Sequence, residues 1–272
     1  MRPSRVLATA LLPLALVACG QSAKKAAPQV VQRPADVLRL AAEKTVAART
    51  ARMEMHISGG GLEMTGSGVT SLTEMKAVMT TKTSIGDRTV DSEVRVLGDV
   101  MWMTTPPGVA VQKPWLKIDV AALGKRLDVD IKALREMQQQ NDPSQSLAYL
   151  QGASDDFAET GTADLRGTPT TIYKGTLNLA KARDGQRSER TRKAIESLIT
   201  KLKSETLPIT VWIDGDGRMR KMIQTIDLAK VTDGQASGTM TTTIEMYDFG
   251  APVVVTPPPA AQVGDGGVLF RR

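Results

Sequence analysis

The chain has 272 residues, a formal net charge of +6 at pH 7, one cysteine and one histidine. These counts exclude an internal disulfide and a metal site built from several cysteines or histidines. The modest positive charge comes without a basic cluster interleaved with aromatic residues, so we expect no nucleic-acid partner. Only 3% of the residues are aromatic while 13 are methionine, which predicts a soft apolar interior of aliphatic and thioether side chains.

The N-terminus has the layout of a lipoprotein signal peptide. Arg2 and Arg5 precede an apolar run over 6–17, which has the roughly 7–15 residues of a secretory segment and not the about 20 of a membrane span. The run ends in Leu16-Val17-Ala18-Cys19, and a lipoprotein needs this thiol to accept its diacylglyceryl group. We predict a signal peptide over 1–18 and a mature chain that is lipid-anchored through Cys19 on the extracytoplasmic face of a bacterial cell membrane. The alternative is a plain signal peptide with a chance cysteine.

The rest of the chain divides into a tether, one domain and a tail. Residues 19–34 are polar and end in proline, which is typical of a flexible linker. Residues 35–250 carry the periodic apolar patterns of a single domain. Residues 251–272 contain a triple proline and a glycine-rich run, so we expect a mobile tail outside the core.

Helical and strand periods alternate along the domain. Spacing of 3.6 residues predicts helices over 35–49, over 123–137 and over 186–204. Asp142 and Pro143 suit the cap and the first turn of one more helix. Alternation of apolar and polar residues predicts strands, the clearest of which lie at 53–57, 90–96, 101–103, 114–119, 157–163, 170–179, 209–214, 218–228 and 239–248.

About eleven strand segments with helices between them predict an α+β domain whose antiparallel sheet has one apolar and one wet face. Methionine recurs at the apolar strand positions, although it is a poor strand former that specifies a core only loosely. A cavity for lipid and a core filled by its own side chains both remain open. The residues expected to point inward are Met53, Met55, Ile57, Val94, Val96, Met101, Met103, Val211, Ile213, Met240, Ile244 and Met246.

Three polar positions have simpler explanations than a catalytic or metal site. Asp214-Gly215-Asp216-Gly217 resembles the start of a calcium loop, but Thr225 stands where the last carboxylate ligand belongs, so a hairpin turn is predicted. Asp155 and Asp156 have no nucleophile or third group near them in the sequence. His56 alternates with methionines and should lie on the wet face. We therefore predict no catalytic residue, no metal and no cofactor.

The helix predicted over 186–204 is amphipathic. Its apolar side consists of Ala194, Ile195, Leu198, Ile199 and Leu202. Its other side is basic and carries Arg187, Arg190, Arg192, Lys193 and Lys201. This basic side is either an ordinary solvated face or a patch that rests on anionic lipid.

Several segments occur in an order and spacing that resemble a known family. They are the motif ending at Cys19, the helix from Ala35 that leads into glycine-punctuated strands, Pro114-Trp115-x-Lys117-x-Asp119, Asp142-Pro143, and Leu207-Pro208-Ile209-Thr210-Val211-Trp212-Ile213-Asp214 followed by Gly217. Over 35–250 the chain resembles the actinobacterial envelope lipoproteins of the LppX/LprA/LprF/LprG group, and more distantly the LolA/LolB lipoprotein carriers. The resemblance implies a strongly curved half-barrel with helices over its concave face, and an apolar cavity that takes acyl chains of lipids or lipoglycans. It brings no catalytic residues to this chain.

Two classes of function follow. The first is a non-enzymatic, membrane-anchored lipoprotein that binds or carries the acyl chains of a lipid or lipoglycan in the cell envelope, with a transport partner protein that the sequence does not identify. The second is an envelope-anchored interaction module with a filled core. An envelope hydrolase is the weakest hypothesis, because the chain offers one histidine and no free thiol after lipidation.

Overall fold

The computed structural model of the chain describes residues 34–108, 112–120, 156–186 and 189–270. Residues Gln32–Arg272 form one compact unit that is separate from Met1–Val31. Cys19, the tether, Asp155 and the helices predicted over 123–137 and at Asp142-Pro143 lie outside the described residues. Within the described part of the chain, no helix is long and apolar enough to cross a membrane.

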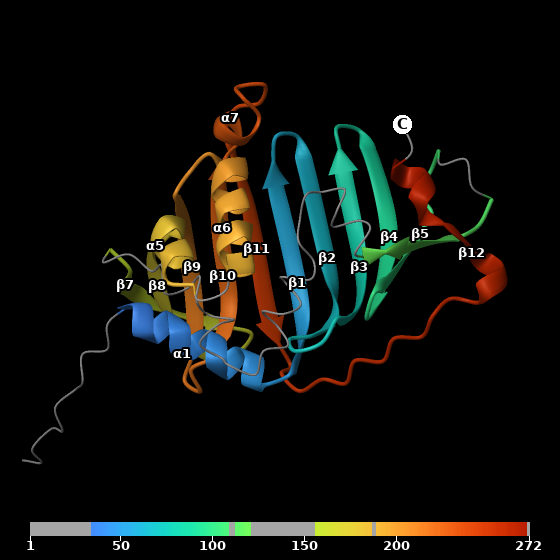
Figure 1. Cartoon of the computed structure of the whole chain (residues 1–272). Helices are drawn as coiled ribbons and strands as arrows, with labels where there is room; N and C mark the ends of the chain where they lie inside the picture. The colour runs from blue at the N-terminus through green and yellow to red at the C-terminus, as the bar shows by residue number, and fades with distance from the viewer. Residues whose placement is uncertain (1–33, 109–111, 121–155, 187–188, 271–272) are drawn as a thin grey trace, which may run out of the picture. The chain divides into compact units, whose positions relative to one another are not determined.

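The unit is built on one twelve-stranded sheet (Figure 1). The helices are α1 (Pro34–Ala47), α5 (Leu179–Asp184), α6 (Glu189–Leu202) and α7 (Leu228–Val231), and the 3-10 helices are η2 (Ala260–Gln262) and η3 (Gly266–Phe270). The strands are β1 (Thr50–Gly59), β2 (Leu62–Ser71), β3 (Lys76–Ile85), β4 (Arg88–Leu97), β5 (Val100–Thr104), β6 (Trp115–Asp119), β7 (Ala158–Leu165), β8 (Thr168–Asn178), β9 (Thr206–Asp214), β10 (Met219–Asp227), β11 (Thr239–Tyr247) and β12 (Val263–Asp265).

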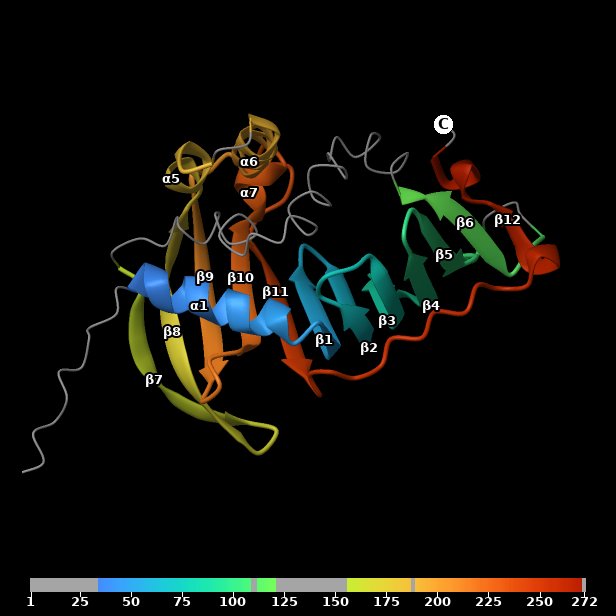
Figure 2. The ribbon, with the colours of Figure 1, turned by 60° about the horizontal axis from the view of Figure 1, so that its bottom comes forward.

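The strand order is β12-β6-β5-β4-β3-β2-β1-β11-β10-β9-β8-β7. All neighbours pair antiparallel except β12 and β6, which pair in parallel. The sheet is curved and does not close, and α1, α5 and α6 lie on the same side of its β8–β10 region (Figure 2). The prediction of an α+β fold with a curved, half-barrel sheet is confirmed, with twelve strands among the described residues where about eleven were expected.

Tight turns hold the hairpins in register. Gly60 and Gly61 connect β1 to β2 with φ of 61° and 78°, which are the two positive values of a type I′ hairpin turn. Only glycine adopts these values without steric cost. The turn fixes Ile57 opposite Met64, and this pairing sets the face on which every later residue of both strands lies.

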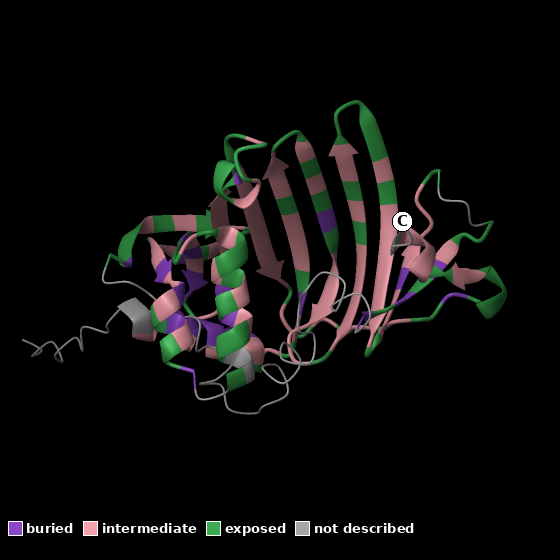
Figure 3. Cartoon of the chain, turned by 45° about the horizontal axis from the view of Figure 1, so that its top comes forward, coloured by how far each residue is buried: buried purple, intermediate pink, exposed green. Residues whose placement is uncertain are grey.

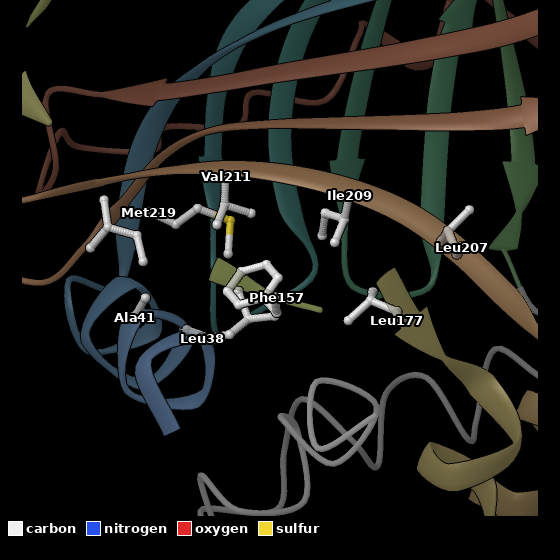
Figure 4. Packing of buried hydrophobic residues seen from close by; sticks show 10 residues of the cluster. Leu38, Ala41, Phe157, Leu177, Leu207, Ile209, Val211 and Met219 are labelled. Atoms are coloured by element: carbon white, nitrogen blue, oxygen red, sulfur yellow. The ribbon is translucent and has the colours of Figure 1, made fainter. Parts of the chain in front are cut away.

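A closed core lies between α1 and strands β8–β10. Phe157 is fully buried at its centre, among Leu38 of α1, Leu177 of β8 and Val211 of β9 (Figure 4). Thr45 fastens the helix to the sheet, because its hydroxyl donates to the Ala41 carbonyl at 2.6 Å and accepts from the Met219 backbone N–H at 2.8 Å. The predicted helix over 35–49 therefore forms, and its buried stripe closes this part of the sheet.

The C-terminal segment differs from the expectation of a tail outside the core. Val263–Asp265 adds β12 to the edge of β6, and Arg95 donates to the Thr256 carbonyl at 2.6 Å. An edge strand leaves backbone N–H and C=O groups unpaired, and β12 pairs part of this edge. Gly266 permits the close approach, because a Cβ there would lie 2.3 Å from Ile118 Cγ1.

Candidate functional site

Cross-strand partners point to the same face of a sheet, so the ladder register shows which side chains lie together. Three adjacent rows of partners cross the middle of the sheet. The row through Met53 consists of Met246, Met53, Gly68, Met79, Val94, Met103 and Leu116. The row through Met55 consists of Met222, Ile244, Met55, Gly66, Thr81 and Ser92. The row through Ile57 consists of Gln224, Thr242, Ile57, Met64, Thr83 and Val90. We call this side of the sheet the methionine face.

All twelve residues predicted to point inward lie on the methionine face, but they differ in what covers them. Val211 is fully buried and Ile213 is 7% exposed, and both belong to the closed core with Leu38. These two residues therefore pack against protein and do not border an open surface. The other ten are half-buried: Met53, Met55, Ile57, Val94, Val96, Met101, Met103, Met240, Ile244 and Met246.

The methionine face continues out of the closed core into a part of the sheet where most of its described side chains are only half-buried. Met222 and Met246 pack against the edge of the core, and their rows run on across β1–β5. In the described part of β1–β4, Ala51 is the one buried hydrophobic side chain. Figure 3 shows the contrast, with buried residues gathered near the helices and mostly intermediate or exposed ones over β1–β5.

Methionine recurs across the whole of this face. Ten of the 13 methionines lie on it, namely Met53, Met55, Met64, Met79, Met101, Met103, Met219, Met222, Met240 and Met246. Thioether side chains are unbranched and polarisable, so they can move to fit apolar groups of different shapes. A face of this kind suits contact with flexible alkyl chains.

Gly66 and Gly68 of β2 lie at the centre of the methionine face and place no side chain there. A Cβ on Gly66 would lie 3.5 Å from the Met79 methyl and 3.6 Å from the Met55 methyl. These two mobile methyls therefore fill the space above Gly66. A Cβ on Gly68 would lie 2.1 Å from the Val78 carbonyl oxygen, so only glycine fits there.

The two faces of the sheet differ in charge. No member of the three rows on the methionine face is charged. The opposite face of β1, β10 and β11 carries an ion-pair network: Arg166 lies 2.5 Å from Glu54, and Lys221 lies 2.8 Å from Glu245. Tyr247 donates to Glu54 at 3.0 Å. The methionine face therefore offers a ligand no counter-ion in these rows.

The network shifts the pKa of two of its members. Partial burial alone would raise the pKa of Glu245, but hydrogen bonds and attraction from Lys221 and Arg166 outweigh it and hold that pKa below its usual value. Burial raises the pKa of Tyr247, and its hydrogen bond to Glu54 adds to this effect. Both residues lie on the wet face, where Glu245 pairs with Lys221 and Tyr247 donates to Glu54.

The polar candidates from the sequence are structural. Asp214 closes the β9–β10 turn by accepting from the backbone N–H groups of Asp216 and Arg218 at 3.1 and 2.8 Å. Asp156 accepts from the Thr176 hydroxyl at 2.8 Å. His56 is exposed on the wet face, 3.5 Å from Glu63. The described residues contain no group of His, Cys, Asp and Glu side chains that could hold a metal ion.

The amphipathic helix expected over 186–204 is α6, and it packs on α5. Ile195 is buried with Leu179 and Ala182, and Ile199 and Leu202 pack against this cluster. Leu198 differs from the expectation because it is 40% exposed. On the basic side Arg192 and Lys193 are exposed, 3.8 and 4.0 Å from Glu189, while the side chains of Arg187 and Arg190 are outside the described set.

Some residues of the methionine face were not expected from the sequence. Met79 lies in the run Ala77-Val78-Met79-Thr80, which has no clear alternation of apolar and polar residues. Gly66 and Gly68 offered no apolar signal at all. Only the register of β2 with β1 and β3 places them at the centre of the face.

No protein-family model matches the chain, and no curated protein matches it. Among solved structures, LprF from Mycobacterium bovis is similar at 13% sequence identity and a TM-score of 0.51, over 84% of this chain and 97% of LprF. The Mycobacterium tuberculosis lipoprotein LppX is similar at 15% identity and a TM-score of 0.49, over 82% of this chain and 98% of LppX. MucB gives 15% identity and a TM-score of 0.36, over 86% of this chain and 62% of MucB. The resemblance to the LppX/LprF-type lipoproteins is confirmed at the level of the fold, which this chain shares with LprF.

Proposed function

We propose that the protein binds the acyl chains of a lipid or lipoglycan on its methionine face and holds or carries them in the cell envelope without chemical change. The observation that supports this most is the uncharged, half-buried face over β1–β5, β10 and β11, which carries ten of the residues expected to point inward. Soluble proteins seldom leave a continuous apolar surface of this kind without a binding role.

The energy of such binding comes from removing alkyl surface from water. Each buried methylene contributes about 0.8 kcal/mol, so sixteen would contribute about 13 kcal/mol. Association costs an estimated 4–15 kcal/mol in lost freedom. Long acyl chains can exceed this cost while short ones cannot, so affinity should rise steeply with chain length.

A matched pair of substitutions in β2 tests the face directly. Met64 is half-buried on the methionine face, and its neighbour Thr65 is exposed on the wet face. Met64→Asp should abolish binding of a fluorescent, uncharged long-chain acyl lipid, because the introduced carboxylate has no counter-ion there. Thr65→Asp should bind like the parent. Equal loss in both variants, or binding that survives Met64→Asp, would contradict the proposal.

We further propose that the mature chain begins at Cys19 and is anchored by acyl groups on that residue. Two or more chains give stable attachment, where one is marginal. Replacing the only cysteine with Ala should move the protein from the membrane to the soluble fraction and remove incorporation of labelled palmitate. Retention of label in Cys19→Ala would show that the acyl groups are attached elsewhere.

A further inference from the structure

Three hydroxyl side chains interrupt the methionine face at one place. Thr81 of β3 and Ser92 of β4 are direct cross-strand partners, and Thr83 follows two residues after Thr81. Partners of this kind have Cβ atoms about 5 Å apart, and residues two apart on a strand about 7 Å. We call these three residues the hydroxyl cluster. It is close enough together for one small polar group to contact all three.

The hydroxyl cluster has no hydrogen-bond partner within the described part of the chain. None of its three side chains takes part in the hydrogen bonds among the described residues, and all three are half-buried. On the wet face the hydroxyls of β3 and β4 are paired, Thr80 with Ser67 of β2 at 3.3 Å and Ser84 with Thr89 at 2.9 Å. No unpartnered side-chain oxygen of the described residues is fully buried. The oxygens of the cluster therefore remain open to a ligand on the methionine face.

The surroundings of the cluster are apolar on the side where an alkyl chain would continue. The next row along the strands holds Met79, Val94 and Met103. Thr81 also adjoins Gly66 and the Met55 and Met79 methyls above it, because its Cγ2 would be 3.3 Å from a Cβ on that glycine. Polar and apolar groups thus follow one another in the order in which they occur in an amphipathic lipid.

We propose that Thr81, Thr83 and Ser92 form an uncharged polar subsite that binds the ester or hydroxyl oxygens of an acylglycerol-type lipid, while its acyl chain lies across Met79, Val94 and Met103. This inference rests on the proposed function and adds the orientation of the ligand. Hydroxyl groups can donate to an ester carbonyl and accept from a hydroxyl. They cannot neutralise a carboxylate or phosphate, and the three rows of the face contain no cation.

Isosteric variants separate the polar subsite from the apolar face. The test protein starts at Gly20 and so retains the whole compact unit Gln32–Arg272. Monooleoylglycerol, oleate and the hydrocarbon 1-octadecene would each compete against an apolar fluorescent dye. The variant Thr81→Val/Thr83→Val/Ser92→Ala removes three hydroxyls with little change of shape. Thr65→Val removes one from the wet face and is the control.

The triple variant should bind monooleoylglycerol roughly tenfold or more weakly, because each neutral hydrogen bond is worth several-fold in affinity. Its affinity for 1-octadecene should not fall, and Thr65→Val should leave all affinities unchanged. An equal loss for the hydrocarbon, no loss for monooleoylglycerol, or tighter binding of oleate than of monooleoylglycerol by the parent would overturn the subsite. Failure of the parent to bind 1-octadecene and the dye would instead refute the proposed function, and the subsite with it.

Discussion

The two halves of the sheet use the same face in different ways. In the closed half, comprising β8–β10, α1 and Phe157, the face is covered by a helix and a ring, and Leu38, Phe157, Leu177 and Val211 are fully buried. In the open half, comprising β1–β5, residues of the same rows stay half-buried. Among the described residues, buried apolar side chains are therefore concentrated in the closed half, while most apolar side chains of the open half keep part of their surface exposed.

The two halves also differ in the types of side chain that line the face. The closed half is packed mainly with branched and aromatic residues that have few rotamers, which suits a unique core. The open half carries methionines such as Met53, Met79 and Met103, which adapt to their surroundings. One continuous sheet thus has a closely packed end and an adaptable end without a domain boundary.

The largest expected effect is on the closed half. Phe157→Ala should lower the free energy of unfolding by about 3–5 kcal/mol, because it leaves a cavity among Leu38, Leu177 and Val211. Val94→Ala in the open half should cost about 1 kcal/mol. Urea denaturation of both variants measures the difference. Similar losses would show that the open half is as tightly packed as the closed half.

The next largest effect is on the backbone of the open half. Gly68→Ala should cost about 2–4 kcal/mol, since its methyl would meet the Val78 carbonyl at 2.1 Å. Gly66→Ala should cost less than about 1 kcal/mol, because the groups it meets include the far ends of Met55 and Met79. Thermal unfolding of the two alanine variants compares them. A larger loss for Gly66→Ala would contradict a face whose side chains can move.

A smaller effect is expected at the far edge of the open half. Removing residues 255–272 takes away β12 and the carbonyl that Arg95 contacts at Thr256. We expect a loss of about 1–2 kcal/mol and faster amide hydrogen exchange in β6. Exchange in β9 should not change. Unchanged exchange in β6 would mean that the C-terminal segment does not protect that edge.

The smallest effect concerns the wet face and pH. The pKa of Glu245 is lowered in the folded state, so its contribution is present above its unfolded pKa of about 4.3 and is lost as the pH falls through the lower folded value. The contribution should not exceed about 1 kcal/mol for this half-exposed pair. Glu245→Gln should reduce the stability difference between pH 6 and pH 3, measured by urea denaturation, without changing lipid affinity. A parallel loss of binding would mean that the two faces are coupled.

The sequence predicts which face of a strand a residue occupies better than it predicts which elements pack over that face. The alternation in Val211-Trp212-Ile213 correctly indicates a strand and its inward residues. It does not show that Val211 and Ile213 are closed off, because Leu38 and Phe157 reach them from segments more than 50 residues away in the chain. Which elements pack over a face depends on tertiary contacts, whereas the direction of each side chain follows from the alternation of successive residues along a strand.

Two further elements could not be expected from local patterns. Strand β3 places Ala77 and Met79 on one face but Val78 on the other, so apolar residues occur on both faces and the alternation is lost. Strand β12 has three residues and pairs with a strand about 150 positions earlier in the chain. Short elements and distant pairings leave no periodic signal.

We propose that the open half of the methionine face holds an acyl chain, and one measurement tests this directly. Native mass spectrometry of the full protein purified from its own host weighs any retained lipid directly. We expect the parent to carry a lipid-sized mass excess beyond its anchor, Met64→Asp to lose it, and Thr65→Asp to keep it. Parent protein that carries no such mass and takes up no fluorescent, uncharged acyl lipid would contradict acyl-chain binding on this face.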